Sequence, residues 1–273
     1  MLEQRTLSVE GQSVHCAIAG EGPPLLFLHG WPTHSGLYRD IIPAVSAHRK
    51  AIAIDLPGFG QSSKPTDVRY SFSFFRRVID GVLEQLDIDD VGLVIHDLGG
   101  PVGLHWAVEN PRRVRELVVL NTLAFADFHW AVKLFVAMVS LPVVAQALTS
   151  PYGIRASIKL GMTSSPTSSV LEAYTKPFAD RAARRALAMA GRHLSVGKLA
   201  QTAKKLNSLE VPTLLMYGTR DKILPDVDRT MSRLQAIWPH ATKIPLSGQG
   251  HFLQEDVPEL VATNMVEFLT RAA

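Results

Sequence analysis

The segment from Val91 to Gly103, which reads VGLVIHDLGGPVG, constrains the fold more than any other part of the chain. Its first five residues, Val91 to Ile95, form an unbroken run of mostly branched apolar residues. Such a run is typical of a strand buried on both faces of a parallel sheet. A helical pattern begins directly afterwards, with three glycines near its start. The segment therefore predicts a sharp strand-to-helix turn with Asp97 at its tip.

A turn of this kind holds its central residue in a strained and exposed pose, the geometry of a nucleophile elbow. The elbow pattern is small-x-nucleophile-x-small, and here it reads Ile95-His96-Asp97-Leu98-Gly99. Gly99 fills the second small position, while Ile95 occupies the first. The start of the helix keeps a carboxylate at position 97 ionised through the helix dipole and the free N–H groups. The alternative is that Asp97 only caps the helix, because aspartate is a favoured capping residue.

Short apolar strands alternate with helices along most of the remaining chain, which predicts a parallel sheet with helices on both faces. A hairpin is expected at the N-terminus around the turn Glu10-Gly11. The patterns predict strands over residues 25–28, 51–54, 91–95, 117–120, 213–217 and 242–244, and helices over residues 37–45, 72–86, 227–237 and 258–271.

The rhythm changes between residues 123 and 207, where no short apolar strand occurs. This stretch predicts several helices, broken near Pro142, Pro151 and Pro177. We therefore expect an α/β core formed by residues 1–122 and 208–273. Residues 123–207 are expected to form a helical cap over the carboxyl ends of the strands, where active sites of open parallel sheets lie.

Three polar residues follow predicted strands in the order Asp97, Asp221, His251. This is the nucleophile, acid, base order of α/β-hydrolases. Asp221 would hold the imidazole of His251 in the correct tautomer and stabilise its protonated form. The other possible position for the acid, after residue 120, carries Asn121-Thr122 and no carboxylate. The backbone N–H groups of Trp31 and Leu98 are the expected oxyanion donors.

The composition indicates which binding partners and which cellular compartment to expect. The net charge of +3 comes from scattered basic residues, which gives no case for nucleic acid binding. Cys16 is the only cysteine, which favours a reducing, cytoplasmic location. The longest apolar stretch, residues 131–148, is interrupted by Lys133 and Pro142 and favours a helix pair beside a cleft over a membrane span. A monomer and a homodimer are both compatible with the sequence.

Nearly the whole chain resembles the Asp-nucleophile branch of the α/β-hydrolases, which contains haloalkane dehalogenases and epoxide hydrolases. The resemblance rests on five segments: FLHGWPTHSGLYRDIIP, DLPGFGQSSKP, LVIHDLGGPVGLHWA, LLMYGTRD and GQGHFLQEDVPE. It implies that Asp97 attacks an electrophilic carbon and forms an alkyl-enzyme ester, which water activated by His251 then hydrolyses. No metal or cofactor is implied.

The resemblance also implies where the two enzyme types differ. Dehalogenases place a tryptophan after the nucleophile to hold the departing halide, and this chain has Leu98 there. Epoxide hydrolases accept an aliphatic residue at that position but need a proton donor over the epoxide oxygen, commonly two cap tyrosines. Tyr152 and Tyr174 are the tyrosines of the cap and the candidate donors.

On this basis the sequence favours a cofactor-independent epoxide hydrolase that converts hydrophobic epoxides to diols. A haloalkane dehalogenase is the alternative, and a non-catalytic ligand-binding protein on the same fold is the alternative from another class. The apolar run from Trp130 to Leu148 predicts an apolar pocket, so that a hydrophobic small molecule and water are the expected partners.

Overall fold

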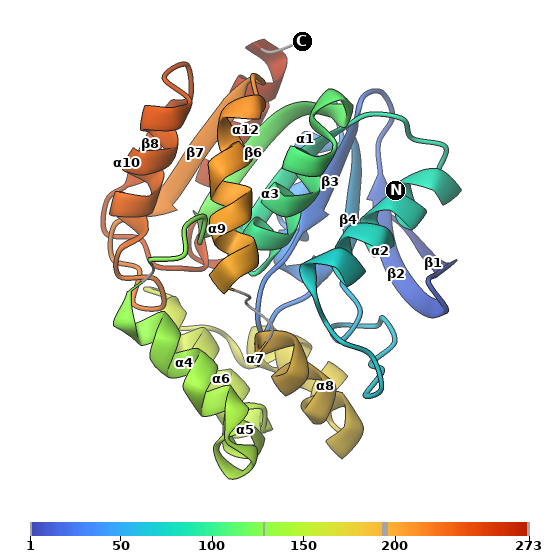
Figure 1. Cartoon of the computed structure of the whole chain (residues 1–273), viewed down its shortest axis with the longest axis vertical. Coiled ribbons are helices and arrows are strands. Elements are labelled where there is room, and N and C mark those ends of the chain that lie inside the picture. The colour runs from blue at the N-terminus through green and yellow to red at the C-terminus, as the bar shows by residue number, and fades with distance from the viewer. Residues whose placement is uncertain (1, 128, 193–195, 272–273) are drawn as a thin grey trace.

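In the computed structural model, which describes residues 2–127, 129–192 and 196–271, eight strands form one sheet in the order β1-β2-β4-β3-β5-β6-β7-β8 (Figure 1). Antiparallel pairing is confined to β1 with β2 and β2 with β4, and the other pairs are parallel. The strands are β1 (Glu3–Val9), β2 (Gln12–Ala19), β3 (Pro24–Leu28), β4 (Lys50–Ile54), β5 (Val91–Asp97), β6 (Val114–Thr122), β7 (Thr213–Gly218) and β8 (Thr242–Leu246).

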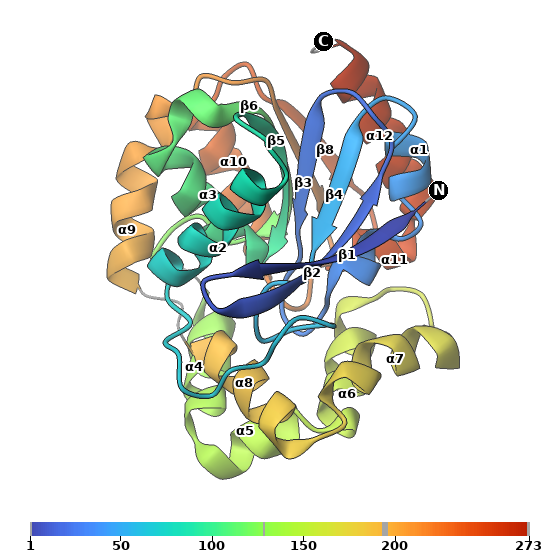
Figure 2. The ribbon, with the colours of Figure 1, turned by 90° about the vertical axis from the view of Figure 1, so that its right-hand side faces the viewer.

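Helices cover both faces of this sheet, as the alternating pattern predicts. On one face α2 packs against α3 and α3 against α9, and on the other α1 packs against α12 (Figure 2). The helices and 3-10 turns around the sheet are η1 (Ser35–Tyr38), α1 (Ile42–Val45), α2 (Phe72–Gln85), α3 (Gly99–Glu109), η2 (Pro111–Arg113), α9 (Val196–Lys205), η4 (Leu206–Ser208), α10 (Val227–Ile237), α11 (Leu253–Asp256) and α12 (Pro258–Arg271).

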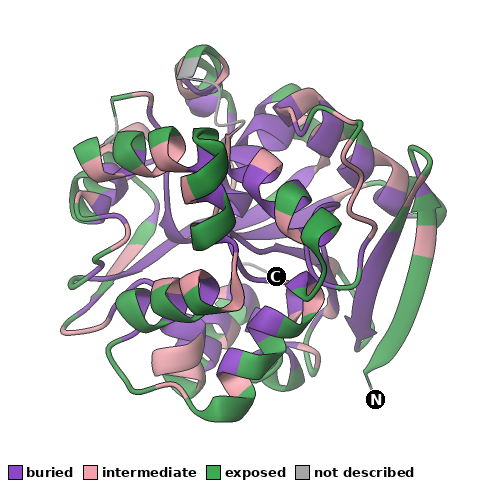
Figure 3. Cartoon of the chain, turned by 90° about the horizontal axis from the view of Figure 1, so that it is seen from below, coloured by how far each residue is buried: buried purple, intermediate pink, exposed green. Residues whose placement is uncertain are grey.

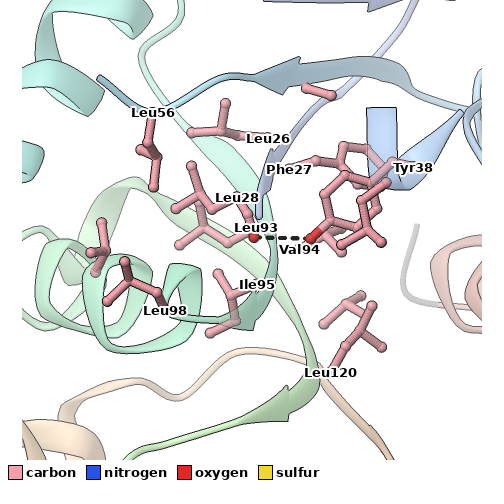
Figure 4. Close-up of a cluster of buried hydrophobic side chains, with 14 of the residues drawn as sticks. Leu26, Phe27, Leu28, Tyr38, Leu56, Leu93, Val94, Ile95, Leu98 and Leu120 are labelled. Atoms are coloured by element: carbon pink, nitrogen blue, oxygen red, sulfur yellow. Dashed lines mark hydrogen bonds between the residues drawn. The ribbon is translucent and has the colours of Figure 1, made fainter. Parts of the chain in front are cut away.

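The central strands are buried on both faces. β3 and β5 pair in register from Leu25 with Gly92 to Leu28 with Ile95, and their side chains meet helix residues on each side. Figure 4 shows this cluster, in which Tyr38 closes one side and donates its hydroxyl to the carbonyl of Leu28 at 2.9 Å. The unbroken apolar runs of the sequence are explained by this two-sided burial.

Several predicted elements are confirmed, and one differs. The hairpin turns at Glu10 and Gly11, both with positive φ, as a two-residue turn requires. The helices over residues 227–237 and 258–271 have the expected bounds. The helix expected over residues 37–45 is instead two short pieces, η1 and α1. Pro43 lies in the first turn of α1, and in one continuous helix it would have no N–H to donate to the carbonyl of Arg39 and its ring would collide with that carbonyl.

Five helices lie together beyond the carboxyl ends of the strands (Figure 1). They are α4 (Trp130–Ser140), α5 (Pro142–Leu148), α6 (Pro151–Gly161), α7 (Ser168–Thr175) and α8 (Arg181–Arg192), with the 3-10 turn η3 (Lys176–Phe178) between the last two. We refer to these five helices as the cap helices. The next helix, α9, packs on α3 beside the sheet, although it belongs to the segment 123–207 expected to form the cap.

Proline sets the break between the first two cap helices. Leu141 adopts an extended backbone before Pro142, which starts α5. Within the described ranges no single helix is long and apolar enough to cross a membrane. Helices α4 and α5 meet that criterion only when taken together, across a bend of 109°.

Candidate active site

The turn between β5 and α3 has the elbow geometry expected around Asp97. Asp97 has a positive φ of 48°, a strained backbone for a residue with a side chain, and its side chain is 13% exposed. A Cβ atom at Gly30 would overlap the side chain of Asp97, and one at Gly99 would overlap the backbone of β3. These glycines allow the chain to pass close to the strained residue.

The isoleucine at the first position of the elbow is accommodated by a third glycine. A Cβ atom at Gly103, one helical turn into α3, would collide with the side chain of Ile95. Because position 103 has no side chain, Ile95 fits between strand and helix, and the elbow forms without a small residue at position 95.

The loops after β7 and β8 bring Asp221 and His251 together as the sequence predicts. Nδ1 of His251 lies 2.7 Å from Oδ2 of Asp221, and both side chains are fully buried. The backbone N–H groups of Ile223 and Leu224 donate to the other carboxylate oxygen of Asp221 at 2.8 and 2.7 Å. Burial by itself raises the pKa of Asp221, but the charge and hydrogen bond of His251 outweigh it and lower that pKa.

Asn121 has a structural role that sequence reasoning missed. Its side-chain amide donates to Oδ2 of Asp221 at 2.8 Å and to the carbonyl of Gly250 at 3.3 Å, while its oxygen accepts the N–H of Gly218 at 3.1 Å. The sequence pattern suggested only a carboxylate for this position. Asn121 lies near the end of β6, between β5, which ends at Asp97, and β7, which precedes Asp221, and this location could have indicated its role.

The imidazole of His251 also faces Asp97. Its Nε2 lies 3.4 Å from Oδ2 of Asp97. Burial lowers the pKa of His251, but the two carboxylates of Asp221 and Asp97 outweigh burial and raise the pKa to about 10. The neighbouring His96 stays neutral, because burial and the charge of His251 lower its pKa to about 3. The two carboxylates therefore favour the protonated, imidazolium form of His251.

Both expected oxyanion donors lie at Asp97. The backbone N–H of Trp31 donates to Oδ1 of Asp97 at 2.7 Å. Burial raises the pKa of Asp97, but the hydrogen bond and charge of His251, together with the backbone N–H of Leu98, bring the pKa below its ordinary value of 3.8. Asp97 is therefore ionised at neutral pH.

The indole of Trp31 points away from the carboxylate. Its Nε1 donates to the carbonyl of Leu187 in α8 at 3.2 Å, and its ring packs edge-on against Phe135 in α4 at 4.8 Å between centroids. The indole N–H is therefore already used to join the core to the cap helices, and it is not free to hold a halide.

A cavity of about 280 Å³ lies between the cap helices and Asp97. Its lining is mainly apolar and includes Leu98, Leu123, Phe135, Met138 and Leu148. Among the described residues that line it, only Asp97, Ser157 and Lys222 carry a charge or a hydroxyl. This is a suitable pocket for a hydrophobic small molecule with an electrophilic carbon at its Asp97 end.

The two candidate proton donors, Tyr152 and Tyr174, do not line this cavity, contrary to the expectation that they face the bound substrate. Tyr152 is 84% exposed on the outer side of α6, because the inward positions of that helix belong to Ile154 and Ile158. Tyr174 is buried, but its hydroxyl donates to the carboxylate of Glu255 outside the cavity lining. Neither hydroxyl is placed to protonate an oxygen bound next to Asp97.

Comparison with known proteins agrees with this geometry. The family model for the α/β-hydrolase fold matches residues 23–258. The chain belongs to the α/β-hydrolase family. Haloalkane dehalogenase 2 from Mycobacterium tuberculosis is 32% identical over 270 residues, which are 97% of this chain and 94% of that protein. The crystal structure of haloalkane dehalogenase DbeA from Bradyrhizobium elkani has a TM-score of 0.89 and 26% identity, and the match covers 100% of this chain and 99% of that one.

A further relative has a different name. Cis-3-alkyl-4-alkyloxetan-2-one decarboxylase from Shewanella oneidensis is 28% identical over 281 residues, with 97% of this chain and 87% of that protein covered. Within the α/β-hydrolases the chain is thus an enzyme of the Asp-nucleophile, haloalkane dehalogenase-like branch. These relatives favour the dehalogenase alternative over the epoxide hydrolase that the sequence favoured.

Proposed function

We propose that the protein hydrolyses hydrophobic haloalkanes through a covalent ester on Asp97. The observation that carries the proposal is the arrangement around Asp97: an ionised carboxylate at the base of an apolar cavity, with His251 3.4 Å away and Asp221 behind it. The similarity to haloalkane dehalogenases over nearly the whole chain supports it.

In the first step a carboxylate oxygen of Asp97 attacks the carbon that bears the halogen. The new C–O bond forms as the carbon–halogen bond breaks, and the halide leaves with the electron pair. The side chain of Leu98 offers no donor to this halide, and the Trp31 indole N–H is used by Leu187. Bromide and iodide should therefore be released much faster than chloride, because they are better leaving groups and need less hydrogen-bond stabilisation.

In the second step water attacks the carboxyl carbon of the ester, and Nε2 of His251 takes its proton. Esterification neutralises Asp97 and so removes one of the two charges that raise the pKa of His251. The imidazole can then lose its proton and act as the base, while Asp221 stabilises the imidazolium that forms. The N–H groups of Trp31 and Leu98 stabilise the oxyanion of Asp97. The products are an alcohol, a halide and a proton.

An oxetan-2-one is a second candidate substrate. It is the ring in the name of the relative from Shewanella oneidensis, and the absence of a halide donor at Leu98 favours it. Attack by Asp97 on C4 would break the ring C–O bond, and the electron pair would stay on the ring carboxylate, which needs no proton. Loss of CO₂ would then form an alkene and expel the carboxylate of Asp97, so that no water is consumed.

One parallel assay tests the proposal. The protein is incubated with 1-bromohexane, 1-iodohexane and a cis-3-alkyl-4-alkyloxetan-2-one, and free halide, CO₂ and alkene are measured. Release of bromide and iodide by the wild type but not by the D97N variant is the expected result. Alkene formation without halide release would favour the second candidate, and halide release that D97N retains would refute catalysis by Asp97.

A further inference from the structure

The outer sides of α4, α5 and α6 expose large apolar side chains. Eight large hydrophobic residues are classed as exposed in the described part of the chain, and six of them lie between residues 130 and 160. They are Trp130, Leu134, Leu141, Val143, Tyr152 and Leu160, and the exposed fraction reaches 65% for Trp130 and 81% for Val143. Such concentration on one part of a surface marks a contact site rather than scattered exposure.

In α4 and in α6 the positions repeat with helical spacing, so each of these two helices presents a stripe. In α4 and the residue after it, Trp130, Leu134 and Leu141 are spaced by four and seven residues. In α6, Tyr152 and Leu160 are eight residues apart, a little over two helical turns, which is a spacing found along one face of a helix. Seen from the side of the cap helices, exposed and buried stretches alternate along them (Figure 3).

The two stripes meet at the mouth of the active-site cavity. Trp130, Leu134 and Leu160 all line the cavity that contains Asp97, and they are also 65%, 47% and 50% exposed. A residue that is half exposed and lines a cavity lies at its rim. The cavity therefore opens on this apolar surface.

The helices α4, α5 and α6 that carry these residues contain only positive charge. From residue 128 to residue 171 the sequence contains Lys133, Arg155 and Lys159 but no aspartate or glutamate. All three cations are exposed, and none forms an ion pair or a side-chain hydrogen bond within the described residues. Elsewhere many arginines are paired, as Arg39 is with Glu255 and Arg115 with Asp90.

We propose that this surface docks onto an anionic lipid bilayer, with the mouth of the cavity facing the membrane. We call it the α4–α6 face, formed by the six exposed hydrophobic residues and the three cations. Tryptophan and tyrosine favour the boundary between head groups and acyl chains, and aliphatic residues extend below it. Lysine and arginine near the boundary bind the negative surface of the membrane.

A second copy of the chain fits this face less well. A twofold contact would place Lys133, Arg155 and Lys159 against the same three cations, and the face has no carboxylate to pair with them. Docking on lipid would instead give the cavity direct access to hydrophobic molecules dissolved in the bilayer.

Vesicle co-sedimentation tests the proposal without using activity. The protein should bind vesicles of phosphatidylcholine with phosphatidylglycerol, bind phosphatidylcholine vesicles far less, and dissociate as salt increases. The variant K133Q/R155Q/K159Q should lose binding by a factor on the order of 100, from about fivefold per charge. The matched control K50Q/R112Q/K204Q removes the same charge outside the cap helices and should bind like the wild type.

A second variant tests the apolar part of the face. L141S/V143S changes two exposed residues that do not line the cavity, and it should weaken binding to the anionic vesicles at low salt while far-UV circular dichroism stays unchanged. The proposal is overturned if neither vesicle type binds the wild type, or if the two charge variants bind equally. It is also overturned if light scattering shows a dimer that L141S/V143S dissociates, because the face then binds a second copy.

Discussion

Replacing His251 with glutamine is expected to let the protein alkylate itself once and then stop. Asp97 does not need His251 for the first step, because the N–H of Trp31 at 2.7 Å and the N–H of Leu98 remain to stabilise its charge. The second step loses its base, because Nε2 is the ring nitrogen of His251 that faces Asp97. Loss of a general base slows a step by a factor on the order of 10² to 10⁴. The ester should therefore accumulate to about one per chain.

The assay is intact-protein mass spectrometry after incubation of H251Q with 1-bromohexane. The expected mass increase is one hexyl group less one hydrogen, and peptide mapping should place it on Asp97. The D97N/H251Q double variant is the control and should remain unmodified. The reasoning is wrong if H251Q forms no adduct with a substrate that the wild type converts. It is equally wrong if the adduct lies on another residue, or if H251Q turns over within tenfold of the wild type.

Four further outcomes are expected. The N121A variant leaves the N–H of Gly218 without its partner and should lower the free energy of unfolding by about 1–3 kcal/mol, measured by urea denaturation. L98W adds an indole N–H near the leaving group and should raise bromide release on the order of 10-fold, so unchanged release would refute the role given to Leu98. Y152F should leave turnover unchanged, because this hydroxyl is outside the cavity. In the folded protein the pKa of His251 is raised to about 10 from 6.5, so its protonation stabilises the fold fully below pH 6.5 and less and less as pH rises to 10. The free energy of unfolding, measured by urea denaturation, should therefore fall between pH 7 and pH 9.5, and it should fall less in H251Q than in the wild type.

The sequence predicted the core of this fold well because its signals are local. The two-sided burial of β3 and β5 requires unbroken apolar runs, and the helix of residues 258–271 shows the periodicity of its buried face. The proximity of Asp97, Asp221 and His251 was predictable for the same reason, since each lies at or after the end of a strand of a parallel sheet and such strand ends share one edge.

The cap helices were less predictable, because their side chains are oriented by contacts between distant segments. Nothing near Tyr174 in the sequence indicates that its hydroxyl binds Glu255, 81 residues later. The outward direction of Tyr152 depends on which face of α6 packs inward, and Ile154 and Ile158 decide this only once the cap is formed. Asn121 was missed because a hydrogen bond to an acid 100 residues away leaves no local pattern.

The hydrogen bonds described between the cap helices and the loop of His251 are made by the end of α6, the segment after it and α7. The end of α6 and the segment after it are bound to the loop that carries His251: the N–H of His251 donates to the carbonyl of Gly161 at 2.6 Å, and the carboxylate of Asp256 accepts the N–H groups of Thr163 and Ser164 at about 3 Å. Tyr174 adds its bond to Glu255 on the same side.

This distribution of hydrogen bonds divides the cap into a fixed half and an adaptable half. A change that moves the backbone of Gly161, whose carbonyl accepts the N–H of His251, would displace His251 and so affect every substrate alike. Changes on α4, whose exposed residues Trp130 and Leu134 lie at the rim of the cavity, and at Leu148 of α5, which lines it, can alter which molecules enter while His251 keeps its place. New substrate ranges in this scaffold should therefore arise from substitutions in α4 and α5, with the α6–α7 segment retained as the part that holds the chemistry in position.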